Sequence, residues 1–105
     1  MADRSVGLVV NGTFEVHPDD RDALIALLTR NAAETQGVEG CISYAFTIDV
    51  SNPNLIHNVE AWTDRASLDK HLNSELMRAA FAEASKLRLF SREVIAYTVT
   101  SAAKI

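Results

Sequence analysis

The sequence predicts an α+β sandwich, in which a four-stranded antiparallel sheet carries helices on one face. Segments of alternating apolar and polar residues, typical of strands, are interspersed with segments of helical apolar periodicity. Their order is β-α-β-β-α-α-β, and the short turn between the second and third strands favours an antiparallel hairpin. The 105 residues suffice for one core, so a single domain over residues 1–105 is expected.

Residues 6–16 (VGLVVNGTFEV) form the first predicted strand, because β-branched residues alternate there with polar ones. Its apolar face comprises Leu8, Val10, Phe14 and Val16. Pro18 suits the first turn of the next helix, which is predicted to run to about Gln36 and to end at Gly37. The apolar stripe of this helix comprises Leu24, Leu27, Leu28, Asn31 and Ala32.

Residues 41–50 (CISYAFTIDV) and 55–62 (LIHNVEAW) form the predicted hairpin. One side of its first strand comprises Ile42, Tyr44, Phe46 and Ile48. Thr63 is expected to cap a short helix, and Ser74 to cap a second helix that reaches about Arg88. The inner stripe of that second helix comprises Met77, Ala80, Phe81 and Ala84. Residues 92–100 supply the last strand.

The predicted sheet has one face without helices, and that face must meet water or another sheet. It is not uniformly polar, because Val9 and Val99 fall opposite to the helix-facing residues. Packing of two sheets face to face would bury these valines. A homodimer through the sheet faces is therefore expected.

Charge and composition exclude several classes of function. The net charge is −4 and lysine and arginine form no cluster, which argues against nucleic-acid binding. No apolar stretch approaches the roughly 20 residues of a membrane span, and the first residues lack a signal-peptide core, so a cytoplasmic protein is expected. The single cysteine, Cys41, excludes an internal disulfide. Neither a metal-ligand spacing nor a glycine-rich phosphate loop is present, so no metal or nucleotide cofactor is predicted.

Three polar or aromatic residues are candidates for chemistry. Asn58 and Trp62 share one face of their strand by alternation, with Glu60 between them. His71 falls on the apolar stripe of the following helix. All three are therefore expected to point into one space between sheet and helices. Each also has a structural interpretation: Trp62 as a core aromatic, His71 as a half-buried histidine with a backbone partner, and Asn58 as a hydrogen-bonding strand residue.

The segment EAWTDRASLDKHLNSELMRAAF (60–81), preceded by FEVHPDDRDALIALL (14–28) and VEGCISYAFTID (38–49), resembles the antibiotic biosynthesis monooxygenase (ABM) family. The similarity extends from about residue 6 to 99. It includes the proline-led helix, the Glu-x-Trp strand end and the histidine nine residues after that tryptophan. The resemblance implies a ferredoxin-like subunit and a dimeric α+β barrel, in which two sheets pack face to face.

The resemblance also implies a pocket between each sheet and its helices. Many members oxidise quinols or anthrones with O₂ and no prosthetic group. His71 would accept the hydroxyl proton, and Asn58 and Trp62 would donate to developing oxyanions. The pocket lining would comprise Phe14, Tyr44, Phe46, Met77 and Phe81. Haem is not expected, because Phe81 stands where the haem-degrading branch has its histidine ligand. Asn11 lies near the position of that branch's first-strand asparagine, and its face depends on the register.

Three functions follow as hypotheses. The first is a cofactor-independent monooxygenase acting on a hydroxylated aromatic, with O₂ as the second substrate. The second is an isomerase of a small carbonyl compound, in which His71 shuttles a proton and turnover needs no oxygen. The third is a non-catalytic dimeric ligand-binding module, which would bind ligands without turnover.

Overall fold

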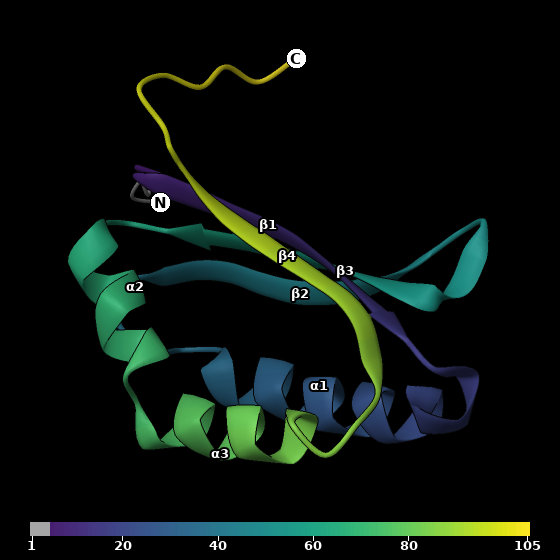
Figure 1. Ribbon diagram of the computed structural model, residues 1–105. Coiled ribbons are helices and arrows are strands. Elements are labelled where there is room, and N and C mark those ends of the chain that lie inside the picture. Colours follow the sequence, from purple (N-terminus) through teal and green to yellow (C-terminus); the bar gives the residue numbers. More distant parts are fainter. Residues whose placement is uncertain (1–4) are drawn as a thin grey trace.

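The computed structural model of the protein describes residues 5–105, so residues 1–4 of the predicted domain lie outside it. The elements are β1 (Leu8–Val16), the 3₁₀ turn η1 (Pro18–Asp20), α1 (Arg21–Thr35), β2 (Cys41–Asp49), β3 (Asn52–Trp62), α2 (Arg65–Leu72), α3 (Glu75–Ala84) and β4 (Leu89–Thr98). The strands form one antiparallel sheet in the order β2-β3-β1-β4. Figure 1 shows α1 and α3 beneath one face of this sheet, with α2 at its end. The predicted α+β, ferredoxin-like class is confirmed.

Alternation along β1 directs its apolar residues toward the helices. Leu8, Val10 and Val16 are buried, whereas Asn11 is exposed on the opposite face. The buried core forms two clusters, one around Trp62 and one around Leu24 and Ile56. The register that the sequence left open for Asn11 is thus decided, and its side chain faces away from the helices.

The first strand of the hairpin contains an irregularity that the sequence did not predict. The pairing of β2 with β3 shifts between Cys41 and Ser43. Cys41 and Tyr44 therefore both join the buried cluster around Trp62, and Ile42 does not. The expectation that Ile42 shares a face with Tyr44 was wrong, because one extra residue breaks the alternation of a strand.

The helix ends follow the capping rules with two corrections. Gly37 adopts a φ of +83° after α1, as predicted, and Ser74 accepts a hydrogen bond from the backbone N–H of Met77. The cap of α2 is Asp64, whose carboxylate accepts from the N–H of Ser67, and not Thr63 as expected. Helix α3 ends at Ala84 instead of about Arg88 because turn hydrogen bonds follow it and β4 already begins at Leu89.

No helix among residues 5–105 is both long enough and apolar enough to cross a membrane.

Candidate functional site

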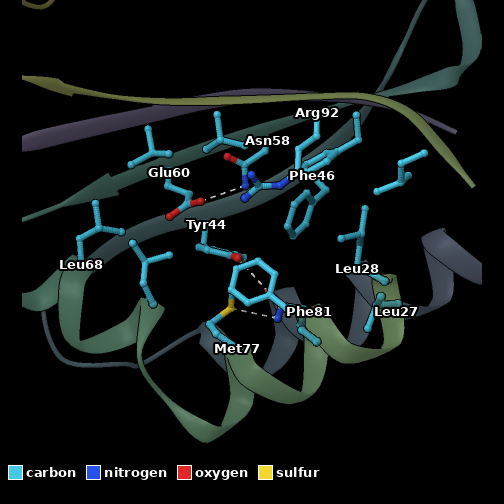
Figure 2. Close-up of a pocket in the computed structure, with 18 of the residues that line it drawn as sticks. Leu27, Leu28, Tyr44, Phe46, Asn58, Glu60, Leu68, Met77, Phe81 and Arg92 are labelled. Atoms are coloured by element: carbon cyan, nitrogen blue, oxygen red, sulfur yellow. Dashed lines mark hydrogen bonds between the residues drawn. The ribbon is translucent and has the colours of Figure 1, made fainter. Parts of the chain in front are cut away.

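A cavity of about 670 Å³ lies between the helix-facing side of the sheet and helices α1, α2 and α3. This volume is typical of small-molecule sites, which occupy roughly 300–1,000 Å³. The structure brings together all five residues predicted to line a pocket, together with leucines of α1 and α2 (Figure 2). These five are Phe14, Tyr44, Phe46, Met77 and Phe81.

The polar end of the cavity is built around the carboxylate of Glu60. Asn58 Nδ2 donates to Glu60 Oε2 at 2.9 Å, and Trp62 Nε1 donates to Glu60 Oε1 at 2.7 Å. The alternation of β3 places all three side chains on the helix-facing side, where they are 3%, 6% and 0% exposed in chain order. Figure 2 shows Glu60 and Asn58 joined at the sheet side of the cavity. Glu60 is the only carboxyl group that lines it within the described chain.

Burial alters the titration of this carboxyl group. Removal from water raises the pKa of Glu60 above its usual range, and the hydrogen bonds from Trp62 and Asn58 oppose part of that rise. The anion is the form that the two donors stabilise, whereas the apolar surroundings favour the neutral acid. A cavity-lining carboxyl group whose pKa is raised in this way is a candidate to accept and return a proton.

Asn58 lines the cavity as predicted, but Trp62 and His71 lie behind its wall. The Trp62 indole is fully buried, and the imidazole of His71 packs against it with ring centroids 5.1 Å apart. The ring of Tyr44 lies 5.6 Å from the same imidazole, edge to face. Neither Trp62 nor His71 contributes to the cavity lining. Asn58 and Trp62 were expected to donate hydrogen bonds to a substrate oxyanion, but in the structure they donate to Glu60.

His71 is neutral at physiological pH, because burial lowers the pKa of its imidazole below the usual value. Its Nε2 has no hydrogen-bond partner among residues 5–105, and the same is true of Asn58 Oδ1. Asn58 lines the cavity, but this amide oxygen is itself buried, so the side chain would have to rotate before a ligand hydroxyl could reach it.

Helix α1 contributes a second polar group to the cavity wall. The hydroxyl of Tyr44 donates to Asn31 Oδ1 at 2.8 Å, and Asn31 Nδ2 donates weakly to Met77 Sδ at 3.4 Å. Burial, followed by the nearby charge of Glu60, raises the pKa of the Tyr44 phenol. Tyr44 therefore stays protonated and keeps Asn31 oriented. It packs edge to face on Phe46 at 5.4 Å, which stiffens the apolar wall.

Comparison with known families decides the classification. Residues 7–83, most of the chain, match the family described as antibiotic biosynthesis monooxygenase. The chain belongs to the ABM family. The resemblance first suggested by the Glu-x-Trp segment is thereby confirmed.

Solved structures share the ABM-like architecture over nearly their full length. A candidate antibiotic biosynthesis monooxygenase from Deinococcus radiodurans superposes with a TM-score of 0.89 at 23% identity, covering 93% of this chain and 97% of that one. Rv0793 from Mycobacterium tuberculosis does so with a TM-score of 0.84 at 26% identity, covering 92% and 98%. At 23% identity, the Deinococcus radiodurans structure shows a shared fold and nothing more.

A curated relative extends further than this chain. The uncharacterized protein sll1783 from Synechocystis is 36% identical over 67 residues, which are 64% of this chain and 46% of that protein. The chain therefore spans about half the length of the curated relative that it matches.

Sequence reasoning noticed Glu60 only as the residue between Asn58 and Trp62. The signal that could have identified it was the alternation itself, which places a carboxylate on the buried face of a strand. Charged side chains are rarely buried without partners, so such a position predicts donors nearby. The donors are the neighbours of Glu60 on the same strand face, Asn58 and Trp62.

Proposed function

We propose that this ABM protein is a cofactor-independent monooxygenase that oxidises a quinol- or anthrone-like hydroxylated aromatic with O₂. The observation that carries the proposal is the buried carboxylate of Glu60 in the wall of a mostly apolar cavity. An apolar lining accommodates a flat ring system, and a buried carboxylate can accept the proton of a ring hydroxyl. Membership of the family supports O₂ as the second substrate.

Glu60 is the proposed proton acceptor, in place of His71. It lines the cavity, whereas His71 does not, and its raised pKa makes it a stronger base than an exposed glutamate. Asn58 and Trp62 are proposed as positioning residues, because each donates a hydrogen bond to one oxygen of Glu60.

The proposed reaction balances without a further reagent. Glu60 takes the hydroxyl proton, and the resulting anion passes one electron to O₂. The two radicals combine at a ring carbon that is conjugated with the oxygen and still bears hydrogen. The peroxide anion takes the proton back from Glu60. Glu60 then removes the carbon-bound proton, so that the C–H electron pair forms C=O and the O–O bond breaks. The expelled hydroxide leaves as water with that proton, and one oxygen atom stays on the ring.

The aromatic and thioether side chains of the wall are the proposed contacts of the substrate ring. Phe14 and Phe46 come from the sheet, with ring centroids 6.3 Å apart, and Met77 and Phe81 come from α3. Tyr44 closes the wall beside Glu60. By excluding water, such a wall favours direct transfer of an electron from the substrate anion to O₂.

Oxygen uptake with anthrone, whose enol tautomer carries the ring hydroxyl, tests the proposal. We expect one O₂ consumed and one anthraquinone formed per anthrone, with one atom of ¹⁸O₂ retained in the product. The control is the same protein after heat denaturation, which measures uncatalysed oxidation. Absence of uptake above that control across a panel of anthrones and quinols would contradict the proposal. Turnover of a carbonyl substrate under strict anaerobiosis would indicate an isomerase instead.

We also propose that two copies pair through the uncovered sheet face. The register sets Val59, Asn11 and Ile95 in one row across β3, β1 and β4, and Ala61, Val9 and Tyr97 in the next. Val59, Ile95 and Tyr97 are 45%, 40% and 49% exposed in the single chain, so a substantial apolar area meets water. Exposed apolar patches of this kind typically mark interfaces.

Substitution on this face tests the dimer. Val59→Glu should shift the protein from dimer to monomer in sedimentation velocity, because each copy would bury an unpaired carboxylate in the interface. The matched control is Ala79→Glu, which adds the same charge on the exposed side of α3. A wild-type protein that sediments as a monomer at micromolar concentration would refute the proposal.

A further inference from the structure

Two arginines line the cavity, and they differ in their partners. Arg65 Nε donates to Asp69 Oδ1 at 2.8 Å, so its charge is balanced within α2. Arg92 on β4 has no carboxylate within ion-pair distance in the described part of the chain. A cavity wall thus contains one guanidinium whose charge is not neutralised by the protein.

Two aromatic rings hold the Arg92 guanidinium in place. Its Cζ lies 5.9 Å from the ring centroid of Phe14 and 5.8 Å from that of Phe81. These cation–π contacts join β1, α3 and β4, and Figure 2 shows Arg92 on the sheet side of the cavity and Phe81 on α3. Guanidinium faces that pack on rings leave the N–H edge free to bind a ligand.

Arg92 lies at the open end of the cavity, and Glu60 lies at the closed end. Arg92 is exposed and its neighbour Phe81 is 43% exposed, whereas Glu60 is 6% exposed. In the register of the sheet, Arg92 on β4 lies opposite Phe14 of β1, and Glu60 on β3 lies opposite Val10 on the other side of β1. The two backbone positions are therefore about 13 Å apart along the strands and two strand spacings, about 10 Å, apart across the sheet.

We propose that the ligand of this cavity carries an acid group, bound by Arg92 at the mouth, at the end of the molecule opposite its hydroxyl. The hydroxyl end rests on the proposed function, and the acid end rests on Arg92 alone. A carboxylate is the anion that best fits, because the planar guanidinium fork accepts its two oxygens side by side. The substrate class is then a hydroxylated polycyclic aromatic carboxylic acid.

Calorimetric titration with two related compounds tests this proposal. The probes are 6-hydroxy-2-naphthoate and 2-naphthol, which share ring and hydroxyl and differ only in the distal carboxylate. We expect the wild-type protein to bind the acid at least about tenfold more tightly, the lower range for a charged hydrogen bond. Arg92→Met should abolish that preference and leave 2-naphthol binding unchanged. Arg65→Met, the matched control, should keep the preference.

Three outcomes would overturn the proposal: equal wild-type affinity for the two probes, full preference retained in Arg92→Met, or equal loss of preference in Arg65→Met. If Arg92→Met does not fold, binding of the methyl ester of the acid to the wild-type protein is measured instead. An ester that binds as tightly as the acid would refute the proposal. The result is independent of turnover. Acid-selective binding without oxygen uptake would contradict the proposed monooxygenase and leave the acid site standing.

Discussion

Substitution of Glu60 by glutamine tests the proposed chemistry most directly. The side chain keeps its size but loses its negative charge and its ability to accept a proton. No other carboxyl group, and no histidine or cysteine, lines the cavity within the described chain. A proton acceptor with no substitute typically contributes about 10²- to 10⁴-fold in rate. We therefore expect kcat/KM to fall by at least about 10²-fold, which is about 3 kcal/mol of transition-state stabilisation.

The folded state should survive this substitution. The glutamine oxygen can accept from either Asn58 or Trp62, but the amide group then faces the other donor. One buried donor left without a partner costs about 1–3 kcal/mol. Removal of a buried charge offsets part of that cost, because burial disfavours the ionised carboxylate. We expect a net loss below about 2 kcal/mol, within the stability of a typical domain.

The assay is oxygen uptake with anthrone between pH 4 and 8, with a thermal transition measured at each pH. In the wild-type protein kcat/KM should fall on the acid side, with a midpoint above the ordinary glutamate pKa of about 4.3, because protonated Glu60 cannot accept a proton. Glu60→Gln should lack this decline. Glu34→Gln, on the exposed side of α1, is the matched control and should behave as wild type. A Glu60→Gln protein within about threefold of wild type would refute Glu60 as the base.

Three further predictions concern stability and the role of His71. Because burial lowers the pKa of His71, its contribution to stability is present above about pH 6.5 and is lost as pH falls through the folded-state pKa. Denaturant titrations should show this loss in the wild type and a smaller loss in His71→Gln. If Glu60 is the base, His71→Gln should also keep its oxygen uptake. Gly40→Ala should lower the free energy of unfolding by more than about 2 kcal/mol, because a Cβ at this φ of +82° would lie 2.2 Å from Ser67 Oγ. Gly37→Ala has a φ of +83° but open space around it, so it should lose only about 1–2 kcal/mol through backbone strain. Equal losses in thermal denaturation would contradict the steric argument. Asp64→Ala should cost about 1 kcal/mol through loss of the α2 cap, and Thr63→Ala should cost less; the reverse order would restore the original assignment of the cap.

The approximate course of the backbone and the faces of its elements could be predicted because both depend on local periodicity. Alternation placed Asn58 and Trp62 on one face, and helical spacing placed His71 on a buried stripe, as the structure shows. The same reasoning failed at Ile42, where an extra residue in β2 changed the register. Periodicity cannot foresee such an insertion, because it depends on how a strand pairs with its neighbour.

The amino-acid sequence by itself determined the order of the elements, the side of the sheet that the helices cover and the family to which the chain belongs. These follow from periods of about two and 3.6 residues, and from turn and cap residues that act within a few positions. Only the tertiary structure decided that Glu60, not a substrate, accepts hydrogen bonds from Asn58 and Trp62, and that rings from β1 and α3 lie beside the Arg92 guanidinium. Hydrogen bonds and ring contacts depend on side-chain torsions and on which distant segments share a cavity, and neither is encoded in residue spacing.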